Sequence, residues 1–168
     1  TPGEAGAATR LARFGAAELA GYDTQRNLPG LAHGTSGLSP HLRFGEISAR
    51  QALAAARHAV DAGKAPARDV EKFAAELGWR EFSYHLLFHN PDLAHKNFQA
   101  RFDAFPWRNA SSAELTAWKT GRTGFPIVDA GMRELWHTGT MHNRVRMIAA
   151  SFLVKDFMAD WRIGEDWF

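Results

Sequence analysis

Hydrophobic and polar positions along the chain follow the period of α-helices. Apolar residues recur three and four positions apart through most segments, and no segment alternates convincingly over the length of a strand. Gly, Pro and Asn residues interrupt these segments, and such residues end helices or open turns. We predict an all-α protein, with helices over residues 10–22, 40–45, 49–62, 66–90, 112–120, 126–138 and 141–160.

Local start signals support several of these boundaries. Ser111 and Glu114 have the spacing of a capping box, in which each side chain bonds the backbone amide of the other residue. Pro126 suits the first turn of a helix, where its missing N–H costs nothing. The long central helix should open at Pro66 or Asp69.

The length of the chain, 168 residues, suits one domain or a large piece of one. Residues 1–8 are small and polar, so we expect a linker or a frayed end there. The folded part should then span residues 9–168. No apolar run is long enough to cross a membrane, and a cytoplasmic protein without a membrane partner is expected.

Composition excludes several kinds of chemistry. The chain has no Cys, which rules out disulfides, cysteine-ligated metals and thiol catalysis. His85 and His89 stand four positions apart, but no third ligand accompanies them, so no metal site is expected. The formal net charge is only +2, and any contact with nucleic acid must come from local arginines. Twelve Phe and six Trp indicate heavy packing or flat surfaces for stacking on rings.

A glycine-rich stretch, GTSGLS, comes just before the predicted short helix. Backbone amides and hydroxyl groups at such a position can cradle an anion without any Lys. No G-K-[ST] follows, so the stretch is not a P-loop. An ordinary loop with a helix cap explains it equally well.

The long helix carries a face that is unusual for a core. At about 100° per residue, five side chains fall within one sector. They are two rings, a carboxylate, a guanidinium and a hydroxyl: Phe73, Glu76, Trp79, Arg80 and Ser83. The plain alternative is a solvated Glu76–Arg80 ion pair, four residues apart, which would contribute little to stability.

The last helix opens with His142-Asn143-Arg144-Val145-Arg146-Met147, written HNRVRM. Two guanidinium groups so close to a buried Phe-Leu-Val run would be costly to desolvate unless something charged meets them. Asn143, Arg146 and Met147 share a stripe that becomes apolar towards Trp161. Read alone, the stripe also fits a core face with a solvated end.

Four segments in this order closely resemble the helical flavin domain of the photolyase/cryptochrome family. They are GTSGLSPHLRFGEIS, AELGWREFSYHLL, WKTGRTGFPIVDAGMREL and TGTMHNRVRMIAASFLVKDFMADWR. The resemblance covers about residues 18–168 and is strongest to class I cyclobutane pyrimidine dimer (deoxyribodipyrimidine) photolyases. It implies an all-helical FAD-binding domain truncated at its C-terminal end. The antenna pigment and the α/β domain that carries it are not expected in this chain.

The resemblance also implies a set of flavin contacts. Family members hold a folded FAD, active in its reduced form, and a tryptophan chain carries electrons to the oxidised flavin. The implied FAD-binding residues are Tyr22, Thr35, Ser36, Gly37, Leu38, Ser39, Phe73, Arg80, Asn143 and Arg146. Trp107 and Trp161 match two members of the tryptophan chain, although both would otherwise be read as packing residues.

The implied activity is light-driven repair of pyrimidine dimers in UV-damaged DNA by a monomeric enzyme. Excited reduced FAD donates an electron to the flipped-out dimer, the cyclobutane ring splits, and the electron returns. Glu76 and Asn143 are implied as catalytic residues with the two tryptophans. The implied DNA- and lesion-binding residues are Arg26, Glu76, Trp79, Arg80, Ser83, Asn143, Arg144 and Met147.

Two other functions compete with this hypothesis. A cryptochrome-type blue-light receptor would share the fold and the flavin but would not repair DNA. An inactive, flavin-free helical fragment that binds nucleic acid is the second. The combination of Glu76, Trp79 and Met147 favours repair, and His142-Asn143 disfavours a (6-4) photolyase. The sequence after the shared Asn-Arg disfavours the single-strand-preferring DASH group.

Overall fold

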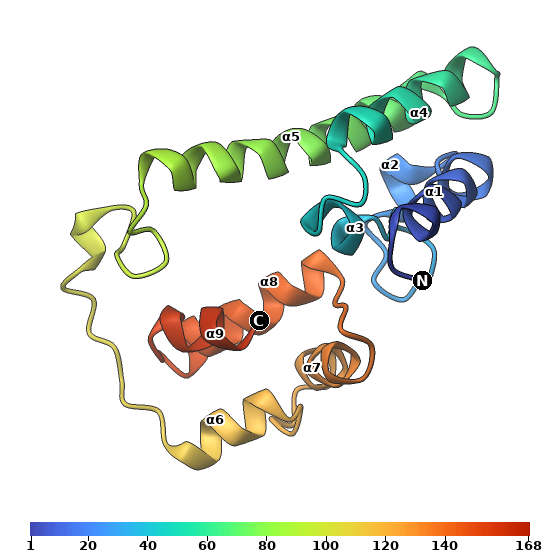
Figure 1. Ribbon diagram of the computed structural model, residues 1–168. Coiled ribbons are helices and arrows are strands. Elements are labelled where there is room, and N and C mark those ends of the chain that lie inside the picture. The colour runs from blue at the N-terminus through green and yellow to red at the C-terminus, as the bar shows by residue number, and fades with distance from the viewer. The chain divides into compact units, whose positions relative to one another are not determined.

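The computed structural model describes all 168 residues and contains helices without strands, so the all-α prediction is confirmed (Figure 1). Three short segments are not α-helical: η1 and η3 are π-helical turns and η2 is a 3-10 turn. The elements in chain order are α1 Glu4–Arg13, η1 Phe14–Glu18, α2 Tyr22–Gln25, α3 Ser39–Arg43, α4 Ala49–Asp61, α5 Ala67–His89, η2 Ala100–Phe102, α6 Ser112–Lys119, α7 Pro126–Thr138, α8 Asn143–Ser151, η3 Phe152–Asp156 and α9 Trp161–Trp167.

The chain divides into two compact units, Thr1–Leu86 and Leu87–Phe168. The first holds α1 to α4 and most of α5, and the second holds α6 to α9. The sequence predicted one folded piece over residues 9–168. This prediction concerns the domain of the whole protein, and it stays a prediction.

The core of the first unit centres on three aromatic rings. Phe14 lies 5.0 Å from Phe73 and 5.6 Å from Tyr22, measured between ring centroids. Around them lie apolar residues of α1, α3, α4 and α5, including three alanines of α4 and Val70 and Leu77 of α5. The Asp69 carboxylate is fully buried beside this core and accepts hydrogen bonds from the amides of Gly21 and Asp23. These bonds fix the start of α2 against α5, because buried amides need partners.

The second unit packs α7 against α8 around Trp118. The indole Nε1 of Trp118 donates to the carbonyl oxygen of Ala149 at 3.0 Å, so this large side chain is buried with its polar atom satisfied. Gly131 faces Val145 so closely that a Cβ at Gly131 would lie 2.2 Å from the Val145 Cγ1. A larger residue at this position would push the two helices apart.

Most predicted helix boundaries are confirmed within a few residues. Ser48 and Ser111 each begin a helix with a complete capping box, and α5 starts just after Pro66. Gly139 ends α7 in the left-handed conformation, with φ of 70°. These boundaries were readable because every signal lies within four residues of the helix end.

The two ends of the chain differ from the prediction. Residues 4–8 are helical rather than a linker, and Ala7 is buried against the core of the first unit. The last helix does not continue to residue 160: η3 ends at Asp156, and a new helix begins at Trp161. Met158 turns the chain with φ of 50°, which few non-glycine residues adopt. The Asp160 side chain then caps α9 by accepting from the amide of Arg162 at 3.0 Å.

No helix of the protein combines the length and the apolar character needed to span a membrane.

Candidate functional site

The glycine-rich stretch is an exposed turn anchored by one buried side chain. Gly37 has φ of 62°, whereas the next residue, Leu38, has φ of −88° and ψ of −6° and is fully buried. Successive residues with φ of opposite sign turn neighbouring amides towards one side, and such turns bind anions. The loop Thr35–Ser39 therefore has a backbone conformation that suits a phosphate.

Tyr22, Arg26 and Glu76 form a connected polar group next to the aromatic core. Burial raises the pKa of the Tyr22 phenol, and its hydrogen bond with Arg26 opposes that rise. The Arg26 guanidinium lies 2.9 Å from one carboxylate oxygen of Glu76, and the Lys72 amine lies 3.5 Å from the other. Glu76 is thus a partly buried carboxylate with cations on both oxygens.

Arg80 has other partners than the sequence suggested. Its guanidinium pairs with the Glu81 carboxylate and donates to the carbonyl oxygen of Leu42 at 3.1 Å. The same group lies 4.7 Å from the centre of the Tyr84 ring. The alternative of a solvated Glu76–Arg80 pair is therefore wrong: the two side chains point to different partners.

Two predicted residues of α5 differ sharply in exposure. Phe73 is only 2% exposed and packs against Phe14 and Tyr22, so within the first unit its ring belongs to the core. Trp79 is 63% exposed and contacts the Phe82 ring edge to face. Ser83 is exposed one turn further, with its hydroxyl donating to the Trp79 carbonyl oxygen. Trp79 therefore presents a flat apolar surface to any ligand that approaches this side of α5.

In the second unit, α8 presents its first turn to solvent. The His142 ring caps the helix by accepting from the Arg144 amide at 3.2 Å. Asn143 and Met147 are exposed and touch each other, with 3.7 Å between Nδ2 and Sδ. Arg146 is partly buried, and its guanidinium lies 4.8 Å from the centre of the Phe168 ring. Desolvation by burial lowers the pKa of Arg146.

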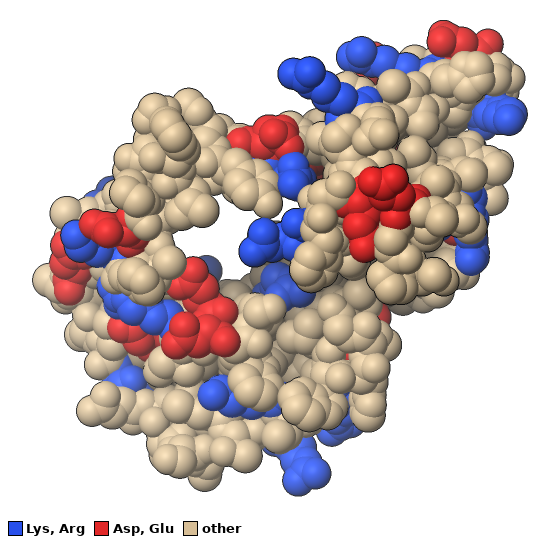
Figure 2. All heavy atoms as spheres, viewed as in Figure 1, with Lys and Arg blue, Asp and Glu red and all other residues tan.

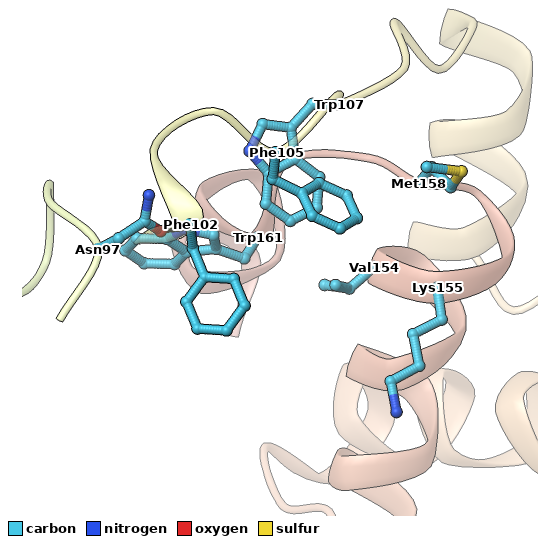
Figure 3. A pocket seen from close by; sticks show the side chains of 8 residues that line it. All are labelled: Asn97, Phe102, Phe105, Trp107, Val154, Lys155, Met158 and Trp161. Carbon is cyan, nitrogen blue, oxygen red and sulfur yellow. Dashed lines mark hydrogen bonds between the residues drawn. The ribbon is translucent and has the colours of Figure 1, made fainter. Parts of the chain in front are cut away.

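Trp107 and Trp161 are brought together around one apolar pocket of about 380 Å³ (Figure 3). Trp107 packs on Phe105 at 4.3 Å between ring centroids, and Phe102 also lines the pocket. The Trp161 indole donates to the Asn97 side chain at 2.9 Å. The family resemblance selected the two tryptophans but not the other residues that line their pocket. The many aromatic residues in the loop before α6 could have indicated those neighbours.

The predicted residues therefore fall into two groups, each assembled within one unit. The first unit holds Tyr22, Arg26, the loop Thr35–Ser39 and the α5 residues from Phe73 to Ser83. The second holds the α8 residues and the two tryptophans. On the face drawn in Figure 2, Lys and Arg lie interspersed with Asp and Glu. No group of three or more His, Asp or Glu side chains is placed to hold a metal ion.

Comparison with known proteins gives these groups a context. The family described as the FAD binding domain of DNA photolyase matches residues 73–168, which is more than half of the chain. The chain belongs to this family. The match begins at Phe73 and includes α8 and both tryptophans, so it runs across the boundary between the two units.

Individual relatives of this photolyase-family chain cover its whole length. The deoxyribodipyrimidine photo-lyase of Agrobacterium fabrum is 52% identical over all of the chain and 34% of the relative. A solved bacterial class III photolyase from Agrobacterium tumefaciens has a TM-score of 0.91 at 52% identity, over 100% of this chain and 34% of the other. A Synechocystis cryptochrome has the same TM-score at 31% identity, over 100% and 35%. The chain spans about a third of the length of the curated relatives it matches.

Proposed function

We propose that this chain is part of a longer, light-driven deoxyribodipyrimidine photolyase, which uses reduced FAD to split cyclobutane pyrimidine dimers in UV-damaged DNA. The observation that carries the proposal is the arrangement on α5. A carboxylate, Glu76, is held by cations one turn from an exposed ring, Trp79. Family membership and relatives named as photolyases support the same function.

FAD suits the residues that are present. The loop Thr35–Ser39 combines hydroxyl groups with a turn in which Gly37 and Leu38 have φ of opposite sign, and hydroxyl and backbone amide groups are the donors that a diphosphate needs. Tyr22 and the partly buried Arg146 add a phenol and a guanidinium from elsewhere in the sequence. In the proposal, Phe73, Arg80 and Asn143 complete the flavin contacts. Bound reduced FAD would supply the light-excited electron for the repair.

The residues of the chain then provide binding and orientation. A dimer must leave the base stack before repair, and an aromatic surface recovers part of the lost stacking energy. Trp79 and Met147 would both contact the dimer. Glu76 would accept hydrogen bonds from the bases, and Arg26, Arg144 and Ser83 would contact the DNA surface. Trp107 and Trp161 would carry electrons towards oxidised flavin.

The class within the family stays a prediction. The segments quoted above resemble class I enzymes, whereas the 52% identical solved structure is that of a class III photolyase. A cytoplasmic location and a monomeric state belong to the same proposal, as does the absence of an antenna pigment from this chain.

A cryptochrome-type receptor is the second candidate, because the Synechocystis cryptochrome matches the fold over the whole chain. Two measurements on the purified full-length protein separate the candidates: its visible absorbance after incubation with FAD, and its affinity in the dark for oligonucleotides with and without one thymine dimer. Photolyase function predicts a flavin spectrum and tighter binding to the damaged strand. A flavin spectrum with equal affinities would favour the receptor. A colourless protein would favour a flavin-free helical protein that binds nucleic acid.

A further inference from the structure

We propose that Arg10 is a positioning residue for FAD: its guanidinium orders the loop Thr35–Ser39 without taking a place in the phosphate site. This inference rests on the proposed function, because it assigns the loop to the FAD phosphates. Arg10 lies on α1, outside the four segments that carry the family resemblance. Its Nη2 bonds the Glu18 carboxylate and also donates to the carbonyl oxygen of Thr35 at 3.1 Å.

The loop backbone lies directly against this guanidinium. A Cβ added to Gly37 would be 2.7 Å from the Arg10 Nε and 3.3 Å from its Nη2. Gly37 also has φ of 62°, a left-handed conformation that favours glycine. Arg10 therefore supports the same turn that directs the loop amides.

Glu18 holds the guanidinium in place. Only 6% of its side chain is exposed, and it lies at the end of η1, directly after α1. Arg13 approaches the other carboxylate oxygen at 3.1 Å, but Arg13 is 57% exposed, and its second contact is the His33 ring at 3.2 Å. The two arginines thus share one carboxylate, and of the two it is Arg10 whose hydrogen bonds reach the loop.

This arrangement has a consequence for binding. A loop that must adopt one conformation around a phosphate loses entropy on binding unless it is already ordered. Hydrogen bonds from a charged donor are stronger than neutral ones, and a planar guanidinium can bond a carboxylate and a carbonyl at once. Arg10 would therefore increase FAD affinity by ordering the loop in the free protein.

The test compares Arg10→Met with Arg13→Met in the full-length protein, because the two variants remove one Glu18 partner each. The first readout is amide hydrogen exchange of the flavin-free protein, and the second is the Kd for FAD. We expect faster exchange at Ser36, Gly37 and Leu38 in R10M alone. We also expect the Kd to rise about tenfold in R10M, the size of one charged hydrogen bond, and to stay near wild type in R13M.

Each outcome decides the proposal. An equal increase in amide exchange of the loop in both variants, or unchanged exchange in R10M, would overturn it. If wild-type protein binds no FAD, the proposed function fails, while the exchange comparison still decides whether Arg10 orders the loop. If R10M does not fold, Arg10→Lys keeps the charge and loses the planar fork. In that variant, faster amide exchange confined to the loop supports the proposal. Unchanged exchange, or faster exchange spread over α1, overturns it.

Discussion

The carboxylate of Glu76 lies 2.9 Å from the guanidinium of Arg26, a residue fifty positions earlier in the chain. Both side chains are mostly buried, at 27% and 16% exposure, so water screens the pair less than it would a surface pair. Lys72 approaches the second oxygen of Glu76 from one turn away on α5. Both carboxylate oxygens of Glu76 therefore have cationic partners, and neither partner is Arg80.

Replacing Glu76 separates catalysis from binding. In full-length protein, Glu76→Ala should lower the repair yield per absorbed photon by about tenfold, the loss of a hydrogen bond to a charged group. Affinity for damaged DNA should change little, because the variant removes a negative charge and leaves Arg26 available for phosphate. Glu71→Ala, an exposed change on the same helix, is the control, with both quantities near wild type. An equal loss of yield and affinity would contradict the assigned role.

Trp79 should matter for the lesion and not for folding. Its side chain is 63% exposed, so Trp79→Ala should change the free energy of unfolding by less than about 0.5 kcal/mol. Stacking on a flipped base contributes about 1–3 kcal/mol, and affinity for a dimer-containing strand should fall accordingly. Bound flavin, measured by absorbance, should stay normal.

Phe82→Ala provides the matched control for Trp79, since Phe82 is 47% exposed and contacts the same indole. It should weaken lesion binding less than Trp79→Ala does. A Trp79→Ala protein stripped of flavin would show that the indole is structural.

Trp107 should serve photoreduction and not repair. Trp107→Phe keeps a ring against Phe105 but removes the indole from the pocket that Trp161 shares. Light-driven reduction of oxidised flavin should become much slower, while repair by chemically reduced enzyme should be unchanged. The control is Trp136→Phe, because Trp136 is 74% exposed and stacks on Trp167 elsewhere in the second unit. Equal photoreduction in the Trp107 variant and the wild type would exclude Trp107 from the chain.

The capping box of α6 makes stability depend on pH. The Arg108 guanidinium and the Ser111 amide and hydroxyl hold the pKa of Glu114 at about 2, below its ordinary value of 4.5. Because the folded state favours the ionised form, the stabilisation is complete above pH 4.5 and disappears as the pH falls towards 2. Glu114→Gln should therefore be less stable than wild type at pH 7 and should approach it near pH 2.

Urea unfolding of both proteins across this range measures the difference. Glu134→Gln, an exposed change on α7, should show no such convergence. A gap between Glu114→Gln and wild type that stays constant from pH 7 to pH 2 would contradict the contribution of the Glu114 charge, since Gln can also form a capping box, as Gln51 does in α4.

Local signals made much of the fold predictable from sequence. The capping box at Ser111 and the proline before α5 act within one helical turn, so reading neighbours was enough. The end of η3 was missed because KDFMAD contains no Gly or Pro, and the turn at Met158 is held by a distant residue: the Arg108 amide donates to the Met158 carbonyl oxygen at 2.8 Å. Asp160 was an available signal for α9, since Asp is a favoured N-cap.

The site was predictable in residue types but not in partners. Resemblance to a family selected Glu76, Trp79 and the loop at Gly37 by position. The partner of Glu76 lies fifty residues away and the loop contact of Arg10 lies twenty-five residues away, and no sequence period connects such distances. Phe102 and Phe105 lie within five residues of Trp107 and gave a local signal, whereas the pocket that Trp107 shares with Trp161 became visible only in the folded chain.

The most direct test of the account is repair itself. Full-length protein with reduced FAD is mixed in the dark with an oligonucleotide that carries one thymine dimer, and half of the mixture is illuminated with blue light. We predict that the dimer is converted to two thymines in the illuminated half alone, and that Glu76→Ala reduces the yield. Flavin-loaded protein that leaves the dimer intact in the light would contradict the proposed function.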